Sequence, residues 1–238
     1  MPQRFDVNGL DMEHFETLRG KIAARLRQIG MRHAHRQIQE HPWLYGALGA
    51  VPSDVMFVCE NPSLGGVEKA HERTITGGAP CTEDQWCGGA ASNCIKRFRP
   101  ALCELGLKTT PPLQPGGWRC YITNVIKEAD IVRDFGARDK ASLAVEWADV
   151  LAWELEHVRP RVLFTVGTNA TELVQLLQRR RLIPALPVPN KVMHYSNRGR
   201  GVTDEFVRIT MISEMKSGLK VGGAMPPPPA APRLIRRT

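Results

Sequence analysis

The sequence predicts an α/β protein of three layers, α/β/α, in which helices cover both faces of a short, mostly parallel central sheet of about four strands. Two observations carry this prediction. Short apolar runs alternate along the chain with longer segments whose apolar residues recur every three or four positions. Loops of polar or turn-forming residues follow these runs, as in sheets whose parallel strands alternate with helices.

The first half of the chain predicts a helix, a buried strand and a second helix. Apolar residues at helical spacing indicate the first helix over 11–41. The run DVMFVC over 54–59 is typical of a buried parallel strand. Residues 74–90 are rich in Gly, Thr and Cys and are expected to be irregular. A helix is expected over 91–106, with a kink or break at Pro100.

The second half continues the alternation. Strands are predicted at 119–126 (RCYITNVI), 161–166 (RVLFTV) and 191–195 (KVMHY). Helices are predicted between them, over 139–158 and, with Thr168 as N-cap, over 169–181. Residues 205–216 fit a strand by alternation and a helix by spacing, so both remain open. We expect one domain over 1–216, with the helical segment 11–41 included, and a flexible Pro- and Arg-rich tail over 217–238.

Composition and charge narrow the function. Lys and Arg number 32 and Asp and Glu 24, and the resulting net charge of +8 favours a polyanionic partner such as nucleic acid. No apolar run reaches about 18 residues, and the N-terminus lacks the apolar stretch of a secretory signal. The six cysteines form no CxxC pair. We therefore expect a cytoplasmic monomer with reduced thiols and no membrane association.

A metal site is not expected. His33 and His35 lie on a predicted helix at a spacing that does not share a face, and His41 does not complete a site with them. A second group of possible zinc ligands has a spacing that matches no common zinc site; its members are His71, Cys81, Cys87 and Cys94.

Three loops that follow predicted strands contain the candidate ligand-binding residues, because ligands of parallel sheets bind beyond the carboxyl ends of the strands. These loops are Glu60–Gly66, Asn124–Glu128 and His194–Gly201. Amides, an imidazole, a carboxylate and two guanidiniums suit a neutral, hydrogen-bonding ligand next to an anionic chain. The residues concerned are Glu60, Asn61, Asn124, His194, Arg198 and Arg200.

Four motifs in sequence, from about 54 to 200, are VMFVCENPS, YITNVIK, RVLFTVGTNATELV and MHYSNRG. In order and spacing they resemble the uracil-DNA glycosylase superfamily. The first motif is similar to G-I-N-P-G/S of the mismatch-specific and thymine-DNA branch and to G-E-A-P-G of the iron–sulfur branch. The second resembles the second strand of the iron–sulfur branch, the third resembles the strand and helix that come next in that branch, and the fourth stands where a His-Pro-Ser type motif is found.

The departures from this pattern are specific. Cys59 replaces the usual glycine, and Tyr195 replaces the proline after the histidine. The cysteines that would hold an iron–sulfur cluster are missing, since none precedes Cys59, Glu128 follows YITNVIK, and 139–158 contains none. The resemblance therefore implies a branch without a cluster, and hydrolysis by water requires no cofactor.

The resemblance also implies roles for individual residues. Asn61 aligns with the position that holds the attacking water, and Glu60 matches the acidic position of the iron–sulfur branch, able to replace or assist it. His194 would donate a hydrogen bond to the charge developing on the base. Asn124 would read the base edge through its amide. Ser63, where strict uracil enzymes carry a tyrosine, predicts a looser pocket that accepts other altered bases.

The resemblance also implies which residues contact the flipped base and which contact the DNA. Trp86 lies where an aromatic ring stacks on the base, and Cys59 is placed among the base-binding positions. The loop with Asn197, Arg198 and Arg200 resembles the wedge that fills the hole left by the base and contacts DNA.

These observations favour a monofunctional DNA glycosylase that flips uracil out of single- or double-stranded DNA and leaves an abasic site for base excision repair. Two alternatives remain at this point: a non-catalytic DNA-binding or damaged-base-binding module of the same fold, and an enzyme acting on free nucleosides. Lys127 also keeps a Schiff-base lyase open.

Overall fold

The computed structural model describes residues 11–28, 47–62, 93–114, 116–128, 140–185, 188–197, 199 and 201–223. The elements in chain order are α1 (Met12–Gln28), β1 (Leu48–Gly49), β2 (Val55–Cys59), the π-helix η4 (Cys94–Phe98), α3 (Arg99–Glu104), β3 (Tyr121–Asn124), α4 (Lys140–Glu146), α5 (Ala148–Val158), β4 (Val162–Val166), α6 (Thr168–Arg179), β5 (Asn190–Val192) and α7 (Asp204–Val221).

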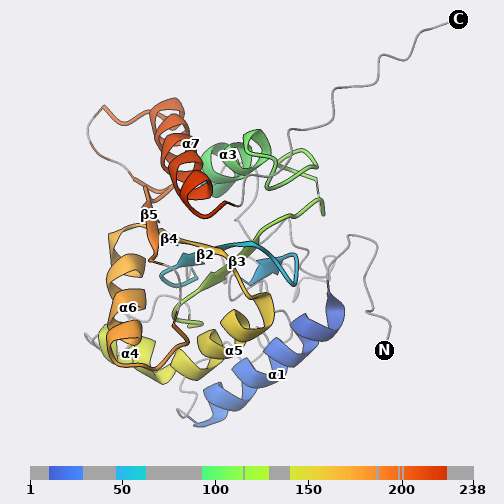
Figure 1. The fold of residues 1–238 in the computed structure, drawn as a ribbon, viewed down its shortest axis with the longest axis vertical. Helices are drawn as coiled ribbons and strands as arrows, with labels where there is room; N and C mark the ends of the chain where they lie inside the picture. The colour runs from blue at the N-terminus through green and yellow to red at the C-terminus, as the bar shows by residue number, and fades with distance from the viewer. Residues whose placement is uncertain are drawn as a thin grey trace, which may run out of the picture.

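A five-stranded sheet in the order β1-β3-β2-β4-β5 forms the middle layer. All neighbours are parallel except β1, which runs antiparallel to β3. Helices α3 and α7 lie on one face, and α1, α4, α5 and α6 lie on the other (Figure 1). The predicted three-layer α/β/α class with a mostly parallel sheet is confirmed.

The sheet has one strand more than the predicted four or so. The added strand, β1, is only two residues long, too short for any apolar pattern. Gly49 allows it, because its φ is +122° and a Cβ there would lie 2.1 Å from the Cys120 carbonyl oxygen. The backbone therefore approaches β3 more closely than any other residue permits.

The central strands are buried on both faces, as their apolar sequences predict. Every residue of β2 and β4 is buried. Phe57 of β2 stacks on Phe164 of β4 with ring centroids 5.0 Å apart, and Phe98 of η4 meets Phe57 edge-on at 5.3 Å. This aromatic contact joins η4 to the centre of the sheet.

Several predicted helices differ in their limits. The predicted helix 139–158 is interrupted at Trp147, which has φ −96° and ψ 1° and separates α4 from α5. The buried indole of Trp147 donates from Nε1 to Glu128 Oε1 at 2.8 Å, a contact outside the helix that local periodicity does not reveal. The predicted helix 91–106 consists of η4 and then α3, whose first turn contains Pro100.

The remaining differences concern chain positions near the ends of elements. Gly167, not Thr168, is the N-cap of α6. The strand predicted over 191–195 is β5, which ends at Val192, so His194 lies beyond it. Residues 29–41 of the first predicted helix lie outside the described residues.

The segment left open over 205–216 is helical and belongs to α7. Its N-cap is Thr203, whose side chain accepts a hydrogen bond from the Phe206 N–H at 3.1 Å. Because α7 continues to Val221, the predicted tail boundary at residue 217 is wrong, and the rest of that tail, 224–238, lies outside the described residues. In the described part of the chain, no helix combines the length and apolarity needed to cross a membrane.

Candidate active site

The carboxyl ends of four neighbouring strands meet at one edge of the sheet. Cys59 at the end of β2 pairs with Asn124 at the end of β3, and Val166 of β4 pairs with Val192 of β5. Backbone hydrogen bonds continue past the strands, from Val125 N–H to the Cys59 carbonyl and from Ile126 N–H to the Glu60 carbonyl, both at 2.9 Å. The loops that carry Glu60, Asn61, Asn124 and His194 therefore begin at this edge, as predicted.

Glu60 accepts bonds at both carboxylate oxygens. Lys140 of α4 forms an ion pair with Oε1, and Asn169 in the first turn of α6 donates from Nδ2 to Oε2 at 2.9 Å. The side chain of Glu60 is 17% exposed, against 43% for Lys140. The carboxylate is thus held in place by two neighbouring helices at the rim of the site.

Asn61 is oriented by its own turn. Its Nδ2 donates to the Pro62 carbonyl oxygen at 3.1 Å. Its side-chain carbonyl oxygen accepts no hydrogen bond from the described residues, and the residue is partly buried. The amide therefore presents an acceptor, while one of its two N–H donors is engaged.

His194 is a neutral hydrogen-bond donor by virtue of its local contacts. The Ser196 backbone N–H donates to His194 Nδ1 at 3.1 Å. Because Nδ1 is an acceptor, the proton of the neutral imidazole is on Nε2. Burial lowers the pKa of His194, opposed by the negative charge of Glu60. The ring thus offers an Nε2–H donor at neutral pH.

The ring of His194 lies against two neighbours, Tyr195 and Gly167. It stacks on Tyr195, with centroids 4.5 Å apart, and Tyr195 in turn stacks on Phe98 of η4 at 5.6 Å. Gly167, with φ +88°, is so close that a Cβ there would lie 3.1 Å from His194 Cβ and 3.2 Å from Cδ2. A side chain at position 167 would displace the imidazole.

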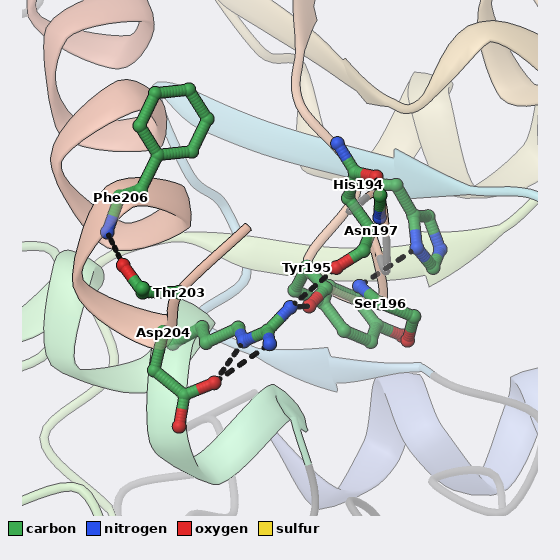
Figure 2. A network of polar contacts seen from close by, with 9 residues as sticks. His194, Tyr195, Ser196, Asn197, Thr203, Asp204 and Phe206 are labelled. Atoms are coloured by element: carbon green, nitrogen blue, oxygen red, sulfur yellow. Dashed lines mark hydrogen bonds and ion pairs between the residues drawn. The ribbon is translucent and has the colours of Figure 1, made fainter. Parts of the chain in front are cut away.

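Arg97 of η4 ties the loop of His194 to α7. Its side chain is 8% exposed. It donates to the carbonyl oxygens of Tyr195 at 2.9 Å and Asn197 at 2.8 Å, and from Nε to Asp204 Oδ1 at 2.7 Å. Figure 2 shows these bonds running between the turn from His194 to Asn197 and Asp204 at the start of α7.

Asn197, a predicted DNA contact, closes this turn. Its N–H donates to the His194 carbonyl at 3.0 Å, and its Oδ1 accepts from Gly199 N–H at 3.3 Å. The neighbouring Arg198 and Arg200 lie outside the described residues, as do Ser63 and Trp86.

Asn124 and Cys59 lie side by side and are both 3% exposed. Burial raises the pKa of Cys59 to about 12, with Lys127 opposing the shift. Cys59 is therefore a neutral thiol at physiological pH and a poor nucleophile.

Lys127 is fully buried and forms an ion pair with Glu154 of α5. Its Nζ also donates to Thr123 Oγ1 and, at 2.8 Å, to the Asn124 carbonyl oxygen. Three acceptors therefore occupy the three N–H donors of the ammonium group. These contacts remove the physical basis for Lys127 as a Schiff-base nucleophile.

Sequence reasoning missed Gly167, Asn169, Lys140 and Arg97. The first two follow β4, and the general rule for the carboxyl ends of parallel strands would have included them. Lys140 and Arg97 act through contacts with residues distant in the sequence, and no local pattern distinguishes them from other basic residues.

Among the cysteines in the part of the chain that the structure describes, Cys94 departs from expectation. Cys94 is disulfide-bonded, so the prediction that all six cysteines are reduced thiols is wrong there. Cys59, Cys103 and Cys120 are free. Within the described ranges, His, Cys, Asp and Glu form no group of three or more that could hold a metal ion.

A comparison with known protein families gives a match. A family model described as "Uracil DNA glycosylase superfamily" matches residues 47–211. This range is more than half of the chain, contains all five strands and ends within α7. No curated protein matches the chain.

Proposed function

Because the chain belongs to the uracil DNA glycosylase superfamily, we propose that it hydrolyses the N-glycosidic bond of uracil in DNA and leaves an abasic site. One observation carries the proposal furthest. His194 presents an Nε2–H donor, because its Nδ1 accepts a hydrogen bond from the Ser196 N–H. This donor lies at the same edge of the sheet as Asn61 and Glu60. A donor, an acceptor and an anion are what this hydrolysis needs.

The reaction breaks the bond between uracil N1 and deoxyribose C1′. The electron pair of that bond leaves with the base, so negative charge develops on uracil and positive charge on the sugar. A hydrogen bond from His194 Nε2–H to a uracil carbonyl oxygen opposes the first charge. One such oriented donor contributes about 3–4 kcal/mol to transition-state stabilisation. Water then supplies the oxygen that bonds to C1′, and its proton leaves for solvent or the base.

We assign the orientation of that water to Asn61. The side-chain carbonyl oxygen of Asn61 accepts no bond from described residues, whereas both oxygens of Glu60 are engaged by Lys140 and Asn169. An amide oxygen is a weak base, but it positions a water by accepting its hydrogen bond. The anionic Glu60 then acts on the positive charge of the sugar through space.

The base and the DNA are read by other residues in this proposal. Asn124 offers amide donor and acceptor groups to the uracil O4 and N3–H edge. Trp86, Ser63 and Cys59 are assigned to base binding from the sequence. Asn197, Arg198 and Arg200 contact the strand, and the net charge of +8 favours DNA as partner. A monomeric state and a cytoplasmic location remain predictions.

The test is a glycosylase assay with the full chain on single- and double-stranded oligonucleotides that contain one uracil, read by alkaline cleavage. His194→Ala is expected to lower kcat about 10²- to 10³-fold. His157→Ala is the matched control, because His157 is exposed on α5 and is expected to retain full activity. Unchanged cleavage by His194→Ala would refute its role.

Two companion variants separate the carboxylate from the amide. Asn61→Ala is expected to lose more activity than Glu60→Gln, because only Asn61 is assigned the water. The reverse order would transfer that role to Glu60. DNA binding by the wild type without any abasic product would favour the non-catalytic reading of the fold.

A further inference from the structure

A closed network of buried polar groups lies directly behind Asn124. Lys127 and Glu154 both have side chains that are 0% exposed, and they form an ion pair. Glu154 Oε1 accepts hydrogen bonds from Tyr121 OH and Thr123 Oγ1, each at 2.7 Å. Tyr121 and Thr123 belong to β3, the strand that ends at Asn124. The pair therefore joins α5 to the carboxyl end of this strand.

Stability alone does not explain such a pair. Removing two charges from water costs free energy that their attraction often does not recover, and apolar replacements of similar volume are frequently no less stable. A buried, fully hydrogen-bonded network does fix the geometry of the groups that it binds. We therefore examined which group at the end of β3 this network holds in place.

The network is bonded to the backbone of Asn124. Lys127 Nζ donates to the Asn124 backbone carbonyl oxygen at 2.8 Å, three residues back along the chain. This bond joins the Lys127 side chain to the backbone at the end of the strand, across a bend at residues 125 and 126. The backbone of Asn124 is thereby fixed by two contacts. One is the hydrogen bond from Lys127, and the other is its strand pairing with Cys59 of β2. Its side chain starts from a fixed backbone.

The network extends to the first helix as well. His14 of α1 lies with its Nε2 at 3.1 Å from Tyr121 OH. Since the hydroxyl donates to Glu154, it accepts from His14. A continuous chain of hydrogen bonds thus connects α1, β3 and α5 to the backbone carbonyl of Asn124.

We propose that Lys127 and Glu154 are positioning residues for Asn124 and thereby determine which base edge the enzyme accepts. The inference rests on the proposed function. Uracil presents an acceptor and a donor at O4 and N3–H, and cytosine presents the opposite pattern at N4 and N3. An amide held in one orientation distinguishes them, whereas an amide free to rotate by half a turn fits both.

The experiment compares Lys127→Met with the double variant Lys127→Met, Glu154→Gln. The single variant leaves an unpaired buried carboxylate and is expected to be unstable. The double variant has no buried charge there, and the glutamine oxygen still accepts from Tyr121 and Thr123. Its midpoint of urea unfolding is therefore expected to recover. Lys108→Met is the matched control, because Lys108 is also buried and also donates to backbone carbonyls, those of Gln114 and Gly116.

The readouts are kcat and KM for oligonucleotides that contain uracil or cytosine. In the folded double variant, kcat for uracil is expected to fall at least about tenfold, as misplacement of a contact group predicts. KM for DNA is expected to stay constant, and the preference for uracil over cytosine to narrow. Lys108→Met is expected to keep that preference. A stable double variant with wild-type kcat and wild-type preference would overturn the proposal.

A second readout does not depend on activity. In ¹⁵N NMR spectra of the free protein, the side-chain amide of Asn124, assigned with Asn124→Asp, is expected to give one sharp pair of signals. The pair is expected to shift or broaden in the double variant. Unchanged signals would overturn the positioning role. If the signals change but the wild type excises no uracil, positioning stands and the proposed function fails.

Discussion

Gly167 is the position where a single methyl group tests the placement of His194. Its φ of +88° and ψ of 168° lie in a region that is essentially restricted to glycine. Any side chain there is strained by about 1–3 kcal/mol. In Gly167→Ala the new Cβ would also lie 3.1 Å from His194 Cβ, so the imidazole must move by a few tenths of an ångström.

The expected effect on catalysis follows from that displacement. A misplacement of about 1 Å costs on the order of 10²-fold in rate, so a few tenths of an ångström corresponds to roughly a three- to tenfold loss of kcat. KM for DNA is expected to change little, because Gly167 contacts the imidazole of His194 and is assigned no contact with DNA. Single-turnover excision of uracil and urea unfolding measure the two effects separately.

Gly223→Ala provides the matched control. Gly223 also has a positive φ, of +61°, but a Cβ there would lie 3.4 Å from Arg161 Nη2, an ordinary contact. It follows α7, far along the chain from the site loops. This variant is expected to be destabilised with kcat unchanged. If Gly167→Ala also loses stability alone, with wild-type kcat, the position of His194 does not govern the reaction and the reasoning fails.

Three further results are expected. Burial lowers the pKa of His14 from 6.5 to about 4, so unfolding takes up a proton between these pH values, and the free energy of unfolding falls by up to about 3 kcal/mol as pH drops from 6.5 to 4. His14→Gln is expected to flatten this dependence in urea titrations, and equal slopes in both proteins would speak against it. Arg97→Met, which removes the donors to Tyr195 and Asn197, is expected to lose about 2–3 kcal/mol of stability and to lower kcat; a variant with wild-type kcat at a temperature where it is folded would separate Arg97 from the site. Thr203→Ala removes the N-cap bond of α7 and is expected to lose about 1 kcal/mol in urea unfolding with excision intact; an equally stable variant would argue against the cap.

The sequence predicts most of this fold because the central strands are mostly apolar. The runs around β2, β3 and β4 are buried on both faces, so composition alone distinguishes them from the amphipathic helices. What it misses depends on long-range contacts. The break at Trp147 is accompanied by a hydrogen bond to Glu128, and β1 depends on the approach of Gly49 to Cys120.

The candidate site divides in the same way. Glu60, Asn61, Asn124 and His194 were predictable as candidates because each lies at the end of a recognisable strand or within two residues of it. The groups that hold them were not, since Lys140 reaches Glu60 from another helix and Arg97 reaches the His194 loop from η4. Local patterns identify candidate chemistry, whereas its supports become visible only in three dimensions.

The tautomer of His194 provides a test of the site in the free protein. Long-range ¹H–¹⁵N NMR correlations are expected to show the proton on Nε2, and titration is expected to give a pKa below 6.5, because burial disfavours the charged ring. Protonation at Nδ1 would remove the acceptor for the Ser196 N–H that orients the ring, so uracil excision is expected to lose activity on the acid side only below pH 6.5. A proton on Nδ1 would contradict the hydrogen bond from Ser196 and the assigned role.

The most direct test of the central claim is the single-turnover rate of uracil release from DNA by the wild type and by His194→Ala. We predict an abasic product from the wild type and a rate about 10²- to 10³-fold lower in the variant, with DNA affinity unchanged. Absence of abasic product from both single- and double-stranded substrates, with DNA still bound, would contradict the proposal that this protein excises uracil.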